Sequence, residues 1–260
     1  EVEKHNATDV VFVDDIPLEK IFPEPAKTLD KKNVGSYLRV TAATALIGLR
    51  EVREISGMPY VALRSKSLRP HQMRLKRLIE LIVVLIFSPL VLTSFLFIAL
   101  LLKIRAKKEI IIKQERIGKD GEIFTLFKFR TMKIDAEIDG KAKLAQIDDE
   151  RILKGCNWLR RTRLDEVPQF WNVLLGQMSI VGPRPERPEM VSKFASEIIG
   201  YSRRHEIPPG ITGLAQTRSG YHTDASYKLG HDLQYLMSWS PVLDLQIMLK
   251  TIVVMFRRKQ

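Results

Sequence analysis

An apolar run at residues 81–102 limits the architecture of this chain more than any other feature of its sequence. None of its 22 residues carries a charge. About 20 apolar residues in an α-helix are long enough to cross the hydrocarbon core of a bilayer. The run therefore predicts a membrane helix, which we place at residues 78–102.

The flanks of this run bear on its path through the bilayer. Basic residues border it on both sides, namely Arg74, Lys76, Arg77, Lys103, Arg105, Lys107 and Lys108. Because Lys and Arg favour the cytoplasmic face and anionic headgroups, both ends favour the same side. Pro89 can bend the helix midway, and the carbonyl that it frees needs a donor, for which Ser88 is a neighbour. A kinked re-entrant helix and an ordinary spanning helix with a tolerated proline both fit these residues.

The charge of the chain indicates an anionic partner. Residues 1–70 hold 11 Lys and Arg against 10 Asp and Glu, so nearly all of the net charge of +12 lies in the remainder. Nucleic acid, anionic lipid and phosphorylated substrates all remain candidates. The single cysteine, Cys156, excludes an internal disulfide framework and a multi-cysteine metal site.

Local patterns predict an α+β fold that is mostly helical. We divide it into a partial α/β segment with its linker, residues 1–70, and a membrane-associated domain, residues 71–260. Periodicity and breakers predict the following elements: strands at 10–13, 60–63 and 124–132, helices at 44–55 and 133–150, a helix start within 164–175, a basic connector at 64–77 and a loop at 207–220. The apolar spacing and the basic end of residues 241–260 predict an amphipathic helix. This helix either lies on an anionic membrane surface or packs in the core.

Residues 160–185 are the most informative stretch of the chain. Asp165 and Glu166 are adjacent, precede Pro168 and follow Arg160, Arg161 and Arg163. Acids at a helix start commonly just complement the helix dipole. Two neighbouring carboxylates also suit a division of labour in which one attacks a substrate and the other holds a divalent cation. The pair alone leaves both interpretations open.

Several blocks in a fixed order resemble the bacterial sugar transferases, the monotopic polyprenyl-phosphate hexose-1-phosphate transferases. The blocks are Lys76-Arg77, Ser88-Pro89, and residues 114–132, 160–186, 209–216 and 231–252. They cover the chain from about Arg74 to Arg258. Residues 1–70 resemble the end of the Rossmann-like domain that precedes the catalytic part of longer members.

This resemblance implies a reaction and its central residues. A hexose 1-phosphate would pass from a UDP-sugar to polyprenyl (undecaprenyl) phosphate, the first membrane step of exopolysaccharide, capsule or glycoconjugate synthesis. Asp165 would be the nucleophile, forming a covalent phosphosugar intermediate with release of UMP, and Glu166 would bind Mg2+. The motif Pro183-Arg184-Pro185 would bind the uridine nucleotide, and Ser88-Pro89 would break a re-entrant helix.

Other residues are candidates for substrate binding beside these. Lys128, Arg130 and Arg163 lie in the blocks and either offset repulsion between a carboxylate and a diphosphate or are solvated surface charges. Gly210, Gly213 and Gln216 fall in a segment that approaches a phosphate closely or simply forms a turn. The expected partners are UDP-sugar, polyprenyl phosphate and membrane lipid, with no nucleic acid. The expected location is the bacterial inner membrane, with the catalytic domain facing the cytoplasm.

Two rival interpretations remain, and two details stay open. A related phosphotransferase that uses another nucleotide-linked donor would share the same membrane surface. A membrane-anchored basic binding protein for anionic lipid or nucleic acid would explain the charge but not the Asp165-Glu166 block. The sequence specifies neither the sugar nor whether the chain forms a homodimer.

Overall fold

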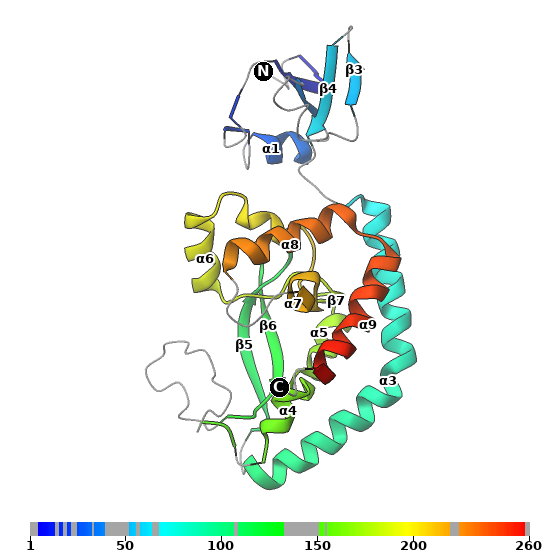
Figure 1. The fold of residues 1–260 in the computed structure, drawn as a ribbon, viewed down its shortest axis with the longest axis vertical. Coiled ribbons are helices and arrows are strands. Elements are labelled where there is room, and N and C mark those ends of the chain that lie inside the picture. The colour runs from blue at the N-terminus through cyan, green and yellow to red at the C-terminus, as the bar shows by residue number, and fades with distance from the viewer. Residues whose placement is uncertain are drawn as a thin grey trace. The chain divides into compact units, whose positions relative to one another are not determined.

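The computed structural model describes residues 5–13, 16–17, 20–21, 25–32, 34–39, 52–55, 58–63, 68–106, 109–132, 151–153, 155–218 and 224–257. The chain divides into two compact units, Glu1–Arg69 and Pro70–Gln260. Each unit is drawn in Figure 1 with its helices and strands labelled. The predicted helix at 133–150 lies outside the described residues.

The first unit is built on a four-stranded mixed sheet. Its elements are β1 (Asp9–Phe12), α1 (Ala26–Lys31), β2 (Gly35–Arg39), β3 (Val52–Ile55) and β4 (Met58–Leu63). The strand order is β1-β2-β4-β3, with β1 and β2 parallel and the other pairs antiparallel. The unit thus contains one βαβ crossover followed by an antiparallel hairpin, and its likeness to a Rossmann-like domain stays a prediction.

Two local predictions in this unit are confirmed and one is wrong. Strands form at the two expected places, as β1 and β4. The predicted helix at 44–55 is wrong over its last four residues, which form β3 and pair antiparallel with β4. Val52 and Ile55 are β-branched and suit a pleated strand, and pairing with β4 satisfies their backbone groups. Residues 44–51 lie outside the described part of the chain.

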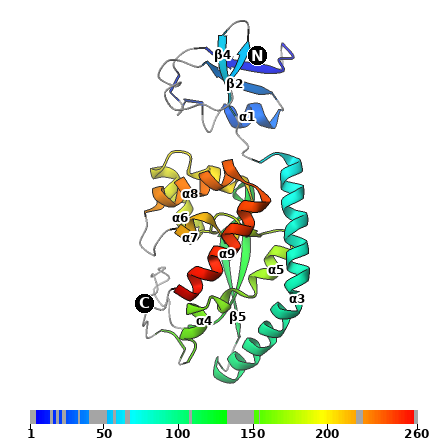
Figure 2. The ribbon, with the colours of Figure 1, turned by 45° about the vertical axis from the view of Figure 1, so that its right-hand side comes forward.

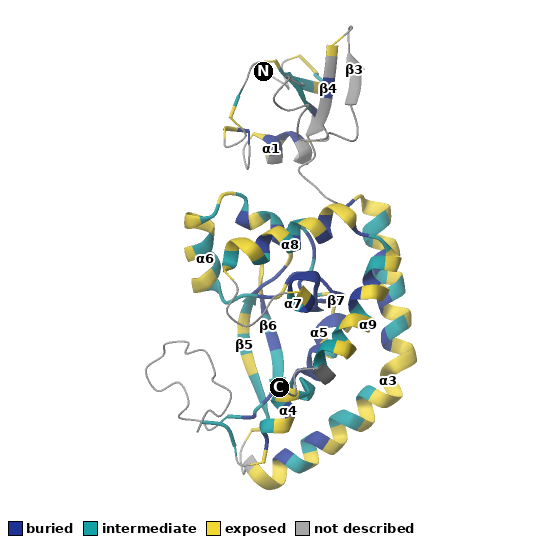
Figure 3. Ribbon diagram, in the orientation of Figure 1, coloured by how far each residue is buried: buried dark blue, intermediate teal, exposed yellow. Residues whose placement is uncertain are grey.

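The second unit begins with α3 (Pro70–Ala106), a helix of 37 residues. The predicted connector at 64–77 is therefore wrong from residue 70 onward, where Pro70 starts the helix. The most apolar 18-residue window of α3 has a mean hydropathy of 2.8, and 11% of it is buried. By length and composition α3 can cross a membrane, and exposed residues run along it in Figure 3.

Pro89 lies inside α3, and its neighbours satisfy the backbone around it. A proline at position 89 leaves the carbonyl of Leu85 without its usual donor. Ser88 Oγ donates to that carbonyl at 2.8 Å, as predicted, and Thr93 Oγ1 donates to the Pro89 carbonyl at 2.9 Å. Figures 1 and 2 show that α3 curves instead of following one straight axis. The re-entrant path through a bilayer stays a prediction.

The remaining elements of this unit pack as helices around two short sheets. They are β5 (Ile111–Ile117), β6 (Ile123–Phe129), α4 (Asn157–Arg161), η4 (Leu164–Glu166), α5 (Gln169–Leu174), β7 (Ser179–Val181), α6 (Pro188–Glu197), η5 (Tyr201–Glu206), β8 (Gly210–Thr212), α7 (Leu214–Arg218), α8 (Ala225–Ser238) and α9 (Pro241–Arg257). β5 and β6 form an antiparallel hairpin, whereas β7 and β8 are parallel. The mostly helical fold is confirmed.

The local predictions for this unit have mixed outcomes. The predicted strand at 124–132 is confirmed as far as Phe129, and the tail helix is confirmed as α9. The predicted loop at 207–220 is wrong over β8 and α7, because a short parallel pairing with β7 orders it. Residues 219 and 220 lie outside the described part.

An apolar core holds the far half of α3 against the elements that carry the acid pair. It consists of Ile98, Leu102, Phe129, Cys156, Leu159 and Val167. The rings of Phe95 and Phe129 also lie 5.1 Å apart, centroid to centroid. Burying a Leu or Phe side chain contributes roughly 1.5–3 kcal/mol, so this cluster fixes β6 and η4 relative to α3.

Lys76 corrects one expectation about the basic flanks. It was predicted to lie with the anionic headgroups, yet only 2% of its surface is exposed. Its ammonium lies 2.8 Å from Glu80 and 2.9 Å from Asp244. The charge is balanced inside the protein, because a Lys with two nearby carboxylates can be buried at lower cost than an unpaired one.

Candidate active site

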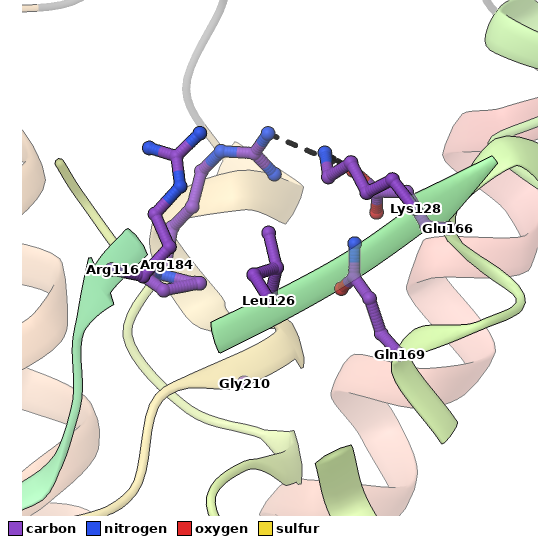
Figure 4. A pocket seen from close by; sticks show the side chains of 8 residues that line it. Arg116, Leu126, Lys128, Glu166, Gln169, Arg184 and Gly210 are labelled. Atoms are coloured by element: carbon purple, nitrogen blue, oxygen red, sulfur yellow. Dashed lines mark hydrogen bonds and ion pairs between the residues drawn. The ribbon is translucent and has the colours of Figure 1, made fainter. Parts of the chain in front are cut away.

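Segments from distant parts of the sequence line one pocket in the second unit. The lining residues are Arg116, Leu126, Lys128, Glu166, Gln169, Arg184, Pro185 and Gly210. They come from β5, β6, η4, α5, β8 and the loop that follows β7. In Figure 4 the guanidinium groups of Arg116 and Arg184 occupy one side of the pocket, and Lys128 and Glu166 occupy the other.

A tight turn carries the acid pair and places Glu166 in the wall of this pocket, with Asp165 next to it in the chain. Arg163 has a φ of 55° in the left-handed region, and η4 follows immediately. A residue other than glycine in that region costs about 1 kcal/mol, and such strain is concentrated at functional sites. The turn leaves Asp165 half-buried and Glu166 buried, just before Pro168 and α5.

Glu166 is held as a carboxylate by surrounding cations. Lys128 Nζ lies 2.9 Å from Glu166 Oε1, and Arg184 Nη2 lies 3.7 Å from the same oxygen. Burial alone would raise the pKa of Glu166, but the charges of Lys128, Arg184 and Arg163 outweigh burial and lower it to about 2. Glu166 is therefore ionised at neutral pH.

Asp165 has the opposite electrostatic environment. Burial raises the pKa of Asp165, the adjacent Glu166 carboxylate raises it further, and Lys128 and Arg160 oppose both, which brings it to about 6. Two neighbouring carboxyl groups thus have pKa values that are driven apart, a pattern typical of sites where two acids have different roles.

Buried polar contacts fix the elements beneath the pocket. Asn172 on α5 accepts from the Phe127 backbone at 3.2 Å and donates to the Thr125 carbonyl at 2.7 Å, which joins α5 to β6. Arg204 donates to the Arg184 carbonyl at 3.1 Å and pairs with Asp232 at 2.8 Å. The backbone that carries Arg184 is therefore anchored from η5 and α8.

Glycines allow the loop after β7 to approach β8. A Cβ at Gly210 would collide with the backbone of Gly182 and Thr212, and one at Gly213 would collide with the Gly182 carbonyl. Only glycine permits this backbone-to-backbone approach. Gly210 consequently forms part of the pocket wall.

The predicted site residues fall into two groups. Lys128, Glu166, Arg184, Pro185 and Gly210 line the pocket, with Asp165 and Arg163 coupled electrostatically to Glu166 and Pro183 buried at the start of the same loop. Among the residues that the structure describes, the lining omits six predicted ones: Asp165, Arg163, Pro183, Arg130, Gly213 and Gln216. Arg130 pairs with Glu109 at 3.6 Å, and the Gln216 amide lies 3.4 Å from the Ile211 carbonyl.

Some pocket residues were not predicted. Arg116 and Gln169 line the pocket, and Arg204 supports it. Arg116 and Gln169 fall within the family-like blocks at 114–132 and 160–186, and this placement is the sequence feature that could have identified them. Nothing in the local pattern distinguishes them from exposed polar residues.

The donor set suits a cation that takes some of its ligands from substrate. Within the described ranges there is no cluster of three or more His, Cys, Asp or Glu side chains that could hold a metal ion. Mg2+ typically uses one or two carboxylates together with waters and substrate phosphates. Adjacent Asp165 and Glu166 carboxyl groups beside a pocket fit that mode.

Comparison with known proteins identifies the family of this chain. Residues 71–258 match the family described as "Bacterial sugar transferase". The UDP-glucose:undecaprenyl-phosphate glucose-1-phosphate transferase of Klebsiella pneumoniae is 41% identical over 212 residues, which is 79% of this chain and 45% of that protein.

Two further relatives are similar to this chain to a comparable extent. The UDP-N-acetylgalactosamine-undecaprenyl-phosphate N-acetylgalactosaminephosphotransferase of Aeromonas hydrophila is 40% identical over 67% of this chain and 41% of its own length. The UDP-glucose:undecaprenyl-phosphate glucose-1-phosphate transferase of Escherichia coli (strain K12) is 37% identical over 80% of this chain and 46% of its own length. The chain spans about half the length of these curated relatives. The predicted resemblance is confirmed, and the chain belongs to the bacterial sugar transferase family.

Proposed function

We propose that this chain transfers a hexose 1-phosphate from a UDP-sugar to undecaprenyl phosphate through a covalent intermediate on Asp165, with release of UMP. The observation that carries the proposal is the Asp165-Glu166 pair beside a cation-lined pocket. Relatives named as undecaprenyl-phosphate sugar-phosphate transferases support the choice of donor and acceptor. The product would begin exopolysaccharide, capsule or glycoconjugate assembly.

The proposed reaction has two displacements at one phosphorus. In the first, an Asp165 carboxylate oxygen bonds to the β-phosphorus, and the bond from that phosphorus to the bridging oxygen breaks. UMP leaves with the electron pair. In the second, an oxygen of undecaprenyl phosphate bonds to the same phosphorus, and the bond to Asp165 breaks. The carboxylate is regenerated, so no external acid, base or oxidant is consumed.

Charges around the pocket suit this chemistry. With a pKa of about 6, Asp165 is mostly ionised at neutral pH and available to attack. Its attack on a diphosphate brings negative groups together, and Lys128 and Arg184 offset that repulsion. We assign Mg2+ binding to Glu166 together with waters and diphosphate oxygens. When bound, the cation supplies further positive charge to the diphosphate.

Isotope exchange tests the covalent step directly. Labelled UMP, incubated with enzyme and unlabelled UDP-sugar without undecaprenyl phosphate, should appear in UDP-sugar, because the first displacement is reversible. Wild-type protein should exchange label, and Asp165→Asn should not. Absence of exchange in a wild-type sample that completes transfer would favour direct transfer between the two substrates.

We also propose that α3 enters and leaves the inner membrane by its cytoplasmic face, where the catalytic domain lies. The basic flanks and the bend at Ser88-Pro89 support this path. Exposed apolar side chains on two other helices would meet the lipid surface: Trp171 and Leu174 on α5, and Val242, Leu245, Leu249, Ile252 and Val253 on α9.

Cysteine labelling at the two ends of α3 tests this topology. Lys76 is buried and Lys107 lies outside the described residues, so Arg74 and Lys103, both exposed, are better positions. In a Cys156→Ser background, Arg74→Cys and Lys103→Cys should both react with an impermeant thiol reagent from the cytoplasmic face only. Reaction of the two positions from opposite faces would mean that α3 spans the bilayer. Adding Pro89→Ala should shift Lys103→Cys toward labelling from the periplasm, because it restores the helical hydrogen bond to Leu85.

A further inference from the structure

Arg116 is the pocket cation that the proposed reaction has not yet used. It lies on β5 opposite Phe124 of β6, and its side chain lines the pocket beside Arg184. Its Nη2 donates to Gln114 Oε1 at 2.9 Å. Its Nε is buried and has no hydrogen-bond partner in the part of the chain that the structure describes. A buried donor without an acceptor is costly unless a ligand supplies one.

The surroundings of Arg116 are unfavourable to its charge. Burial lowers the pKa of Arg116, and the neighbouring Arg184 and Arg187 lower it further, while Glu186 and Glu166 oppose them in part, giving about 10. Arg116 still carries its charge at neutral pH. A cluster of cations at one place favours the binding of an anion there.

The group that Arg116 contacts differs in charge from the group that the two other pocket cations lie near. Lys128 and Arg184 both lie near the Glu166 carboxylate, whereas the Arg116 guanidinium donates to the neutral amide of Gln114. The lining has three cations and one carboxylate, a net charge of +2. The diphosphate of a nucleotide sugar carries two negative charges. An arginine fork also matches the spacing of two phosphate oxygens.

The position of Arg116 in the pocket determines which phosphate of the nucleotide sugar it can bind. The reacting β-phosphorus must reach Asp165, which adjoins Glu166 and is coupled to Lys128. Arg116 lies across the pocket from Lys128 and Glu166 (Figure 4). The α-phosphate, which stays with uridine in UMP, is farther from Asp165 than the β-phosphate, which is transferred with the sugar. The α-phosphate therefore lies toward Arg116.

We propose that Arg116 binds the phosphate of the nucleotide that departs, and that it stabilises the negative charge developing on UMP as it leaves. This inference rests on the proposed function, because it takes UMP as the leaving group. Arg116 would then contribute to the first displacement and not to the second, in which UMP takes no part.

Nucleotide binding and thermal unfolding of the full chain in detergent test the assignment. Arg116→Met should weaken UMP binding roughly tenfold to a hundredfold, the range expected for a charged hydrogen-bonded contact. Binding of uridine, which has no phosphate, should change less than twofold. Ligand-free Tm should not fall, because a crowded cation is removed, but the rise in Tm caused by UMP should largely disappear. Arg116→Lys should give intermediate UMP affinity, since it keeps the charge and loses the fork.

Lys113→Met is the matched control. Lys113 is an exposed cation on the same strand, three residues away and on the other face. This variant should keep UMP affinity within twofold of wild type. Unchanged UMP affinity in Arg116→Met, or equal loss of UMP and uridine binding, would overturn the assignment while leaving the proposed function standing. A wild-type protein that binds no UMP would instead overturn the proposed function together with this inference. Where Arg116→Met does not fold, the same criteria apply to Arg116→Lys.

Discussion

Replacing Asp165 with asparagine is expected to reduce sugar-phosphate transfer by roughly a thousandfold or more, because an amide cannot serve as the attacking carboxylate. The fold should survive. Burial, chiefly, raises the pKa of Asp165 from 3.8 to about 6, so its ionised form is less favourable in the folded than in the unfolded protein above that pH. Removing the charge should therefore leave Tm at pH 7.5 unchanged or raised. UMP release from UDP-sugar in the presence of undecaprenyl phosphate measures the loss.

Asp120→Asn provides the control for this substitution. Asp120 is an exposed aspartate in the turn between β5 and β6, with 68% of its side chain accessible. Its left-handed φ of 55° is one that asparagine tolerates well. This variant should retain wild-type turnover and Tm. Near-normal turnover by Asp165→Asn would remove Asp165 from the nucleophile's role, and loss of activity with a fall in Tm would point to a structural role.

The sequence predicts the acid pair well because its two members are chain neighbours. Their chemistry depends on residues that are far away in the sequence. Lys128 is 38 positions from Glu166, yet the two side chains are in contact. Motif blocks placed both residues in the site, but no local pattern predicts that one would neutralise the other. The separation of the two carboxyl pKa values therefore emerges only with the fold.

Buried polar residues were the hardest to predict, for a related reason. Residue type alone predicts that Lys76 and Arg204 are exposed, since most Lys and Arg side chains lie at the surface. Their burial depends on carboxylates supplied by other elements, Asp244 on α9 and Asp232 on α8. Hydropathy, by contrast, depends on the local chain alone, which is why α9 and the apolar part of α3 were predicted, although α3 begins eight residues before the predicted start of the membrane helix.

The cluster around Lys76 joins four elements of the second unit. Lys76 Nζ contacts Glu80, Asp244 and Tyr235 within 3.0 Å. Tyr235 donates to Asp244 at 2.6 Å and lies 3.1 Å from the Val181 carbonyl, and Glu80 accepts from the Ile180 backbone at 3.2 Å. The cluster thus connects α3 and α9 to α8 and to β7. Because β7 leads directly into the loop that carries Arg184, a disturbance here should reach the pocket.

Lys76→Met is expected to destabilise the second unit by about 3–5 kcal/mol, the usual effect of removing one partner from a buried ion pair. Two carboxylates, Glu80 and Asp244, would then face each other in the interior with no cation between them. The free energy of unfolding in urea, measured in detergent, should fall by that amount, and transfer activity should fall with it as Arg184 loses its support.

A second substitution separates charge from packing in this cluster. Adding Asp244→Asn to Lys76→Met removes one of the two stranded carboxylates while keeping a side chain whose one oxygen can still accept from Tyr235 or Trp239, which donate to different oxygens of Asp244. The double variant should therefore be more stable than Lys76→Met alone, even though Asp244→Asn by itself is destabilising. Lys103→Met, an exposed position on the same helix, should unfold like the wild type. A Lys76→Met protein as stable as wild type, or a double variant in which the two losses simply add, would show that the ion pairs do not hold α3 to the rest of the unit. Recovery in the double variant would mean that the basic residue near the start of this helix acts on the catalytic unit and not on the lipid headgroups.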